Sequence, residues 1–312
     1  MTDSSSEMVV VKKKRSFIAD FFIRLWKEKP LGTAGAIITL ILLATGIFAN
    51  LLAPYGMNES HVYDALTAPS AKYWLGTDNL GRDILSRVIF GARISVIVGL
   101  AGSGIAALLS VFIGILSGYI GGKFDLIVQR FVDALMCFPG LILLMVLMSI
   151  IGTGVLQVII VLGFRWGVTG SRVIRGATIS IKENVYVEAA KSIGCSTTRI
   201  LIRHILPNIM APVIVLFTTR VPNVILVEAA LSFLGFGIPP PTASWGGMLS
   251  GNARMYMFMA PWMAVWPGLA LAFVVYGVNI FGDAVRDLLD PRLRGGIGRY
   301  GVRVEKQAKK LA

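Results

Sequence analysis

The chain has 312 residues, of which 55% are hydrophobic and only 15% are charged, and its mean hydropathy is +0.73. A soluble domain of this size exposes far more charge, so the composition predicts a protein that crosses a membrane several times. The formal net charge is +13, but the basic residues cluster in tails and loops. This distribution favours membrane orientation and contact with anionic lipid headgroups over nucleic acid binding, for which the sequence carries no recognition motif.

Six apolar stretches are each close to the roughly 20 residues that a helix needs to cross a bilayer. They predict an all-α integral membrane protein with six transmembrane helices. The expected spans are 32–53, 94–119, 131–151, 155–174, 209–231 and 262–281. We expect a kink in the third span at Pro139 and a short inner loop over 121–130. Lys and Arg are concentrated in the tails and in the loop after the fourth span, so the positive-inside rule predicts that both termini are cytoplasmic.

The same pattern divides the chain into five parts. These are a cytoplasmic tail (1–30), a first transmembrane helix (31–53), an extracytoplasmic loop (54–92), a five-helix core (93–284) and a cytoplasmic tail (285–312). Residues 17–26 mix aromatic and basic side chains and predict an interfacial helix. In the outer loop, we expect Asp78 and Asp83 to pair with Arg82 and Arg87.

The sequence offers little that could perform catalysis. It has two cysteines, Cys137 in an apolar segment and Cys195 in a polar loop, which we expect to be unpaired. Metal-ligand spacing and a GxxxxGK[ST] phosphate loop are both missing, so neither a metal nor ATP is expected to bind. His61 and His204 fall in different loops, and no paired carboxylates accompany a Ser or His. We therefore expect a non-catalytic protein without a cofactor.

A polar interruption between two very apolar segments is Asn184–Asn208, with the sequence NVYVEAAKSIGCSTTRILIRHILPN. Its distinctive residues, in chain order, are Glu188, Ala189, Ala190, Gly194, His204, Leu206 and Pro207. The pattern predicts a short helix, a turn at the glycine and a second helix that ends at the proline. The small side chains leave a shallow surface that a groove on another protein can approach closely.

This pattern resembles the EAA loop of ABC importer permeases, which forms a coupling helix that sits in a cleft of the cytoplasmic ATPase subunit. The EAA triplet, the glycine and the Leu-Pro pair fall at the family spacing, and HILPN is similar to the dipeptide, oligopeptide and nickel branch. Other segments resemble the same branch, namely LGTDNLGRDILSR (75–87), GARIS (91–95), LSFLGFGIPPPTASWGGML (231–249) and GDAVRDLLDPRLR (282–294). The resemblance implies the type I ABC importer permease fold.

The resemblance also implies a function, that of the second permease subunit of a dipeptide or oligopeptide importer in the plasma (inner) membrane of a prokaryote. Such a subunit pairs with a homologous but different permease, binds two cytoplasmic ATP-binding subunits and receives substrate from an extracytoplasmic binding protein. ATP hydrolysis then belongs to the partners. Residues 188–194 would transmit closure of the ATPase to the helices, with Ala189 and Gly194 acting sterically and Glu188 through a hydrogen bond or ion pair.

Other interpretations remain open at this stage. A nickel or metal-chelate permease shares the branch motifs, although no cluster of Met or His supports a metal. A secondary transporter driven by an ion gradient predicts inverted repeats, broken helices and intramembrane acids, and the expected spans contain few acids. A purely structural membrane subunit leaves the EAA and HILPN segments without a purpose.

Two arginines, Arg165 and Arg220, fall near the middle of the fourth and fifth spans, where the family usually carries apolar residues. An arginine at mid-bilayer costs at least about 2.5 to 3.5 kcal/mol on insertion scales, so each needs a partner or a wet cavity. Either both line the translocation path and hold the carboxylate of a passing peptide, or each pairs with a backbone carbonyl or a buried acid such as Glu228. A third alternative is that the span limits are misplaced and the guanidinium reaches an interface.

Overall fold

The computed structural model describes residues 17–256 and 258–289, and within these ranges the regular structure is helical. The predicted tails lie partly outside the described residues, over 1–16 and 290–312. The α-helices are α1 (Phe17–Glu28), α2 (Pro30–Ile47), α3 (Ala49–Leu52), α4 (Ile84–Ile120), α5 (Gly122–Cys137), α6 (Gly140–Ile151), α7 (Val155–Lys182), α8 (Val185–Ser192), α9 (Thr197–Ile200), α10 (Met210–Phe233), α11 (Trp245–Leu249), α12 (Asn252–Met255) and α13 (Trp262–Leu289). The structure also contains three short helical turns, η1 (Val62–Asp64), η2 (Leu201–Ile205) and η3 (Leu206–Ile209).

Four described helices are long and apolar enough to cross a membrane. These are α2, α4, α13 and the continuous run Thr197–Phe233 that contains α10. The pair α5 and α6 passes the same test only together, as a broken span whose halves meet at 96°. α7 has 28 residues, but basic side chains such as Arg165 and Arg172 lower its hydropathy. Length and composition therefore identify four or five candidate spans, not the six expected.

The second expected span is longer than its apolar stretch, because α4 runs for 37 residues from Ile84 to Ile120. Asp83 begins the helix: its carboxylate accepts a hydrogen bond from the Ser86 N–H at 2.7 Å, as an N-cap residue does. At 1.5 Å per residue the helix is about 55 Å long, more than the hydrocarbon thickness of a bilayer. The last nine residues of the predicted loop 54–92 are thus helical.

The predicted inner loop over 121–130 is wrong. Gly121 alone, with a φ of +70°, separates α4 from α5, and the residues after it form the first half of α5. The expected disturbance at Pro139 is confirmed and exceeds a kink, because the helix stops there and α6 leaves at 96°. A proline inside a helix removes one backbone hydrogen bond and clashes with the preceding turn, which accounts for the break.

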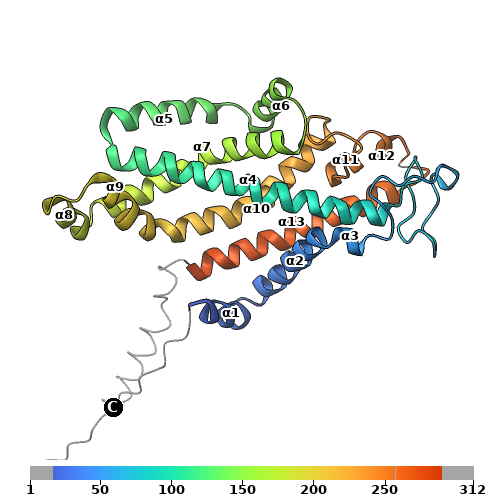
Figure 1. The fold of residues 1–312 in the computed structure, drawn as a ribbon, viewed down its shortest axis with the longest axis horizontal. Helices are drawn as coiled ribbons and strands as arrows, with labels where there is room; N and C mark the ends of the chain where they lie inside the picture. The colour runs from blue at the N-terminus through green and yellow to red at the C-terminus, as the bar shows by residue number, and fades with distance from the viewer. Residues whose placement is uncertain (1–16, 257, 290–312) are drawn as a thin grey trace, which may run out of the picture.

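The largest interface between helices joins α4 and α7, which run side by side (Figure 1). Glycines allow the two backbones to approach. A Cβ added at Gly114 of α4 would lie 2.7 Å from Ile174, and one at Gly163 of α7 would lie 2.6 Å from Ile105. Four residues after each of these glycines comes a second glycine. This is the small-xxx-small spacing with which membrane helices associate.

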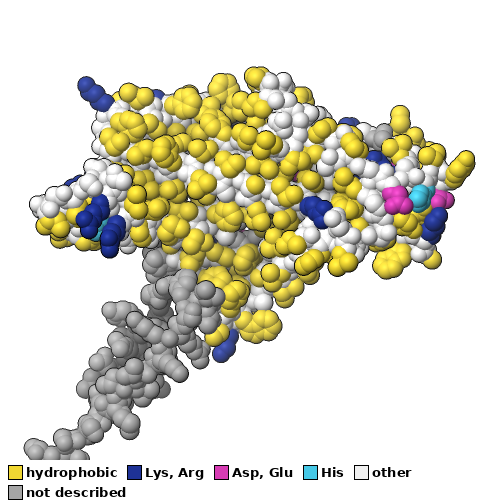
Figure 2. Space-filling model, viewed as in Figure 1, with side chains coloured by type: hydrophobic (Ala, Val, Ile, Leu, Met, Phe, Trp, Pro, Cys, Tyr) yellow, Lys and Arg dark blue, Asp and Glu magenta, His cyan; other side chains and the backbone are white. Residues whose placement is uncertain are grey.

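The bundle has two polar ends with an apolar surface between them. α8 and α9 form one end, and the 54–83 loop lies with α11 and α12 at the other (Figure 1). On the face shown in Figure 2, Lys and Arg side chains are visible at both ends, whereas Asp and Glu gather at the end opposite α8. This distribution is typical of a protein whose middle is surrounded by lipid and whose basic end faces the cytoplasm.

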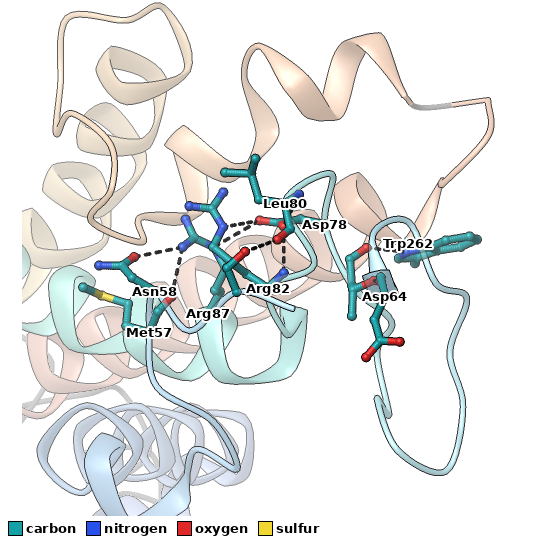
Figure 3. A network of polar contacts seen from close by, with 10 residues as sticks. Met57, Asn58, Asp64, Asp78, Leu80, Arg82, Arg87 and Trp262 are labelled. Atoms are coloured by element: carbon teal, nitrogen blue, oxygen red, sulfur yellow. Dashed lines mark hydrogen bonds and ion pairs between the residues drawn. The ribbon is translucent and has the colours of Figure 1, made fainter. Parts of the chain in front are cut away.

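The outer loop is ordered around Asp78 (Figure 3). Its carboxylate accepts hydrogen bonds from Arg82 Nε at 2.6 Å and from the Leu80 N–H at 2.9 Å, and lies 3.8 Å from Arg87 Nε. The expected pairing of Asp78 with the arginines is therefore confirmed. The expected pairing of Asp83 with an arginine is wrong, because that carboxylate caps α4.

Longer-range contacts fasten the outer loop to the bundle. The Trp262 indole N–H donates to the Thr77 carbonyl at 3.1 Å, at the start of α13. Nearby, Asp64 accepts hydrogen bonds from Lys72 Nζ and Tyr73 Oη, both at 2.8 Å, which hold the pKa of Asp64 below its usual range. These contacts give the loop a structural role.

The helix predicted over 17–26 is confirmed as α1. Leu25 is buried against Ala284 and Leu288 of α13, while Phe22 and Trp26 remain exposed. A helix that buries one apolar face on protein and exposes aromatic side chains beside basic ones suits the lipid headgroup region.

The glycine-mediated contact of α4 with α7 predicts that Gly114→Ala destabilises the protein. The added methyl would force Ile174 and the Ser171 carbonyl to move, and overpacking of this kind typically costs about 1–3 kcal/mol. We expect a thermal midpoint in detergent several degrees below that of the wild type. Gly104→Ala is the matched control, because a Cβ there meets nothing within 4 Å. Equal midpoints for the two variants would contradict this packing.

Candidate functional site

The 184–208 segment forms the tip of the bundle, where the chain leaves α7 and returns through α9 to α10 (Figure 1). α8 carries the EAA triplet and begins after Asn184, whose carbonyl accepts the Val187 N–H at 2.9 Å. The helix ends at Gly194, whose φ is +80°, and the Cys195 N–H then donates back to the Ala190 carbonyl at 3.0 Å. This is the usual glycine-terminated helix end, so the predicted short helix and glycine turn are confirmed.

The prediction that the second helix ends at Pro207 is wrong. α9 continues through η2, a turn with i to i+5 hydrogen bonds, and through the 3₁₀ turn η3 into α10. Pro207 occupies the first turn of η3, where its missing N–H is not required. The wider turn before it makes room for the ring, so the chain changes its helical pitch and does not break.

The inner face of α8 is fixed to the bundle. Val187 is fully buried and Ala190 is 5% exposed, and both belong to a cluster of buried apolar residues. The other buried members are Ile115, Ile174, Ile200, Ile205 and Ile209, which come from α4, α7, α9, η2 and η3. Leu206 packs partly buried against the same cluster. Ala190 and Leu206 therefore contact the interior and are not available to a partner.

The outer face of α8 is uncovered. Glu188 and Ala189 are exposed, and the side chain of Glu188 forms no hydrogen bond or ion pair with any described residue. Val185 and Ile193, at the two ends of α8, are each 80% exposed. Apolar side chains left uncovered beside an unpaired carboxylate make this face a candidate contact surface.

His204 and Pro207 lie beside this outer face. The His204 ring is 6.4 Å from the ring of Tyr186, between centroids, and the His204 carbonyl accepts from Asn208 Nδ2 at 2.6 Å. Pro207 is exposed. The structure thus gathers Glu188, Ala189, His204 and Pro207 at one tip.

The sequence analysis missed the side chains that fasten this tip. The Lys182 ammonium donates to the Tyr119 carbonyl at 2.6 Å, and the Lys191 ammonium lies 5.3 Å from the Tyr119 ring. Asp125 of α5 accepts from Arg175 Nε of α7 at 2.6 Å. Opposite charges at matching depths of neighbouring spans could have indicated the second contact, but residue 125 was expected to lie in a loop.

The two mid-span arginines lie near one aromatic ring. The guanidinium carbons of Arg220 and Arg165 are 4.4 Å and 5.9 Å from the centroid of a Trp166 ring. Within the described part of the chain, neither guanidinium forms a salt bridge or hydrogen bond. The suggested pairing with Glu228 is wrong, because that carboxylate accepts from Ser232 Oγ at 2.7 Å.

Arg220 also lines a cavity of ≈ 420 Å³ between α7, α10 and α13. Its lining residues are Val173, Ala211, Pro212, Val215, Leu216, Thr219, Arg220, Arg286 and Leu289. Among the described residues, the lining contains two arginines and no carboxylate. This cavity can therefore attract an anion.

Comparison with known proteins agrees with the motifs in the sequence. Residues 110–295 match the family described as the binding-protein-dependent transport system inner membrane component. The glutathione transport system permease protein GsiD of Escherichia coli O6:K15:H31 (strain 536 / UPEC) is 39% identical over 275 residues, which cover 88% of this chain and 90% of the relative. The GsiD proteins of Shigella boydii serotype 4 (strain Sb227) and Shigella sonnei (strain Ss046) match to the same extent.

The positive φ of Gly194 predicts that Gly194→Val loosens α8, whereas Gly194→Asn is tolerated. Left-handed backbone costs an ordinary residue about 1–2 kcal/mol, and least for Asn. We expect amide hydrogen exchange over 185–194 to be about tenfold faster in the valine variant, a ratio that corresponds to about 1.4 kcal/mol. Equal exchange in both variants and in the wild type would contradict the role of this turn.

Proposed function

Because this chain belongs to the family of binding-protein-dependent transport system inner membrane components, we propose that it forms the translocation path of an ATP-driven importer together with a homologous permease. It is an ABC transporter permease of the dipeptide, oligopeptide and nickel branch, and it resembles the second permease subunit. A permease of this kind implies an ATPase and a binding protein as partners. In our proposal two ATP-binding subunits dock at the cytoplasmic end, and the binding protein delivers substrate at the opposite end.

The observation that carries this proposal is the uncovered outer face of α8. Docking of an ATPase subunit there would bury Val185 and Ile193 and would give the carboxylate of Glu188 a partner. Ala189 lies at the middle of the face, where its small side chain allows close approach. The ATPase would thereby hold α8 in its cleft, as the resemblance to the EAA loop implies.

Movement of the ATPase would reach the membrane helices through the inner face of α8. Val187 and Ala190 are buried against isoleucines of α4, α7 and the α9–η3 segment that leads into α10. Close-packed apolar contacts transmit displacement because interiors are dense and resist compression. A shift of α8 would therefore turn these helices together and switch the path between inward-open and outward-open states.

We further propose a topology of six spans with both termini in the cytoplasm. α2, α4, α10 and α13 would each cross the membrane, and α5 with α6 would cross as a broken span. α7 would be the sixth, because two of its charged side chains have protein partners: Arg175 pairs with Asp125, and Arg172 pairs with Asp133. An interior helix can carry such residues where a lipid-facing helix cannot.

The substrate that we propose is a small peptide. Each relative described above is a permease of a glutathione transport system, and glutathione is itself a tripeptide. Arg165 and Arg220 would line the path, since both lie in mid-span without a described counter-charge.

The docking role predicts that Ala189→Glu removes ATPase binding. A carboxylate buried without a partner at an interface costs about 2–5 kcal/mol. In detergent, the wild-type permease pair should co-purify with stoichiometric ATPase, and the variant should retain less than about a tenth of it.

The matched control is Ala71→Glu, the same substitution at an exposed position of the outer loop. It should leave ATPase recovery unchanged, which would separate docking from a general effect of added charge. Wild-type recovery of ATPase by Ala189→Glu would rule out α8 as the docking element.

A further inference from the structure

A group of buried hydrogen-bond donors without acceptors lies inside the helical bundle. Arg165 Nε and Nη1 are shielded from solvent and find no partner among the described residues, and the same is true of Trp166 Nε1. The Arg220 guanidinium lies over the same indole ring, also without a described partner. Buried hydrogen-bond donors in native proteins are nearly always paired with an acceptor. The acceptor for this group is therefore expected to come from another molecule.

Among the described residues, no ion pair or hydrogen bond brings a carboxylate to this group, and its surroundings add positive potential. Arg165 is close enough to Arg220 for the two charges to repel each other. A Cβ on Gly140 would lie 3.6 Å from Arg165 Nη2, so the guanidinium is beside the N-terminus of α6, a helix of 12 residues. The free N–H groups of a helix N-terminus act as a partial positive charge. Three positive elements therefore point to an anion.

One member of the group, Arg220, borders a cavity that a ligand can enter. Arg220 lines the cavity of ≈ 420 Å³ between α7, α10 and α13, which Arg286 also lines. This volume lies within the range of about 300–1,000 Å³ that small-molecule sites occupy. A ligand that enters this cavity meets mainly apolar side chains and then the guanidinium of Arg220.

From this geometry we infer that Arg165, Trp166 and Arg220 form a binding site for a carboxylate of the transported substrate. The inference rests on the permease function proposed above and names the class of substrate: small peptides with a free carboxylate. A planar guanidinium can hold a carboxylate through two parallel hydrogen bonds, and the indole N–H supplies another donor. The indole ring also holds the Arg220 guanidinium in place through a cation–π contact.

The test is direct binding to the complete importer, with partner permease and ATPase subunits, in nanodiscs without the binding protein. Glutathione and its diethyl ester, which lacks both free carboxylates, are compared by equilibrium dialysis. We expect glutathione to bind at least about tenfold more tightly than the ester, as expected for a charge-assisted hydrogen bond. Arg220→Gln and Arg165→Gln should each reduce this preference to less than about threefold, while Arg220→Lys retains part of it.

Arg254→Gln is the control, because it removes the same charge from an exposed position at the outer end. It should leave the preference intact. Equal preference in the wild type and Arg220→Gln, or no measurable binding of either compound to the wild type, would overturn the inference. If the Arg220→Gln variant no longer co-elutes with the partner permease on size exclusion, the inference is also overturned. That result would mean that the arginines pair with a carboxylate of the partner permease and not of the substrate.

These outcomes are separate from those of the docking experiment. If the wild type recruits no ATPase, the proposed importer fails, although a carboxylate preference of the permease pair alone could still be measured. If ATPase docks through Ala189 but glutathione and its ester bind equally well, the importer stands and the carboxylate site fails.

Discussion

The contact of Val187 and Ala190 with the surrounding isoleucines is the interaction on which the rest of the structure depends. It fixes the short helix α8 to the long helices α4 and α7. Without it, α8 would be a surface loop free to move independently, and force applied to its outer face would be lost. Because of this contact, one side of the eight-residue helix α8 packs against the bundle, while the other side remains open to a partner.

The charges of α7 separate into two groups by their partners. Towards the C-terminal end of α7, Arg172 and Arg175 meet Asp133 and Asp125 of α5, so the cost of placing charge within the bundle is offset by pairing. At the middle of the helix, Arg165 lies beside an indole ring and the N-terminus of α6, with a second arginine nearby. The paired charges hold α5 against the bundle. The unpaired ones are suited to a transient acceptor, which is the reason to connect them with transport.

The sequence located the apolar stretches and the tip correctly, because both follow from local composition. It failed where local pattern and tertiary packing diverge. The first half of α5 carries charges that indicated a loop, but Asp125 finds Arg175 of a distant helix. Pro207 indicated a helix end, but the wider turn η2 before it makes room for the proline ring, and the helix continues. The contact of Arg220 with Trp166 joins two different helices, and no spacing in the sequence reveals it. Likewise, the direction in which Ala190 faces depends on what surrounds α8.

The most direct test of the account is photo-crosslinking from the outer face of α8 in the assembled importer. A benzophenone maleimide would be attached at Ile193→Cys, with Cys137 and Cys195 replaced by serine, and compared with the same probe at the exposed Val62→Cys of the outer loop. The account predicts a crosslink to the ATPase subunit from position 193 and none from position 62. Labelling of both positions without any ATPase crosslink from position 193 would contradict it.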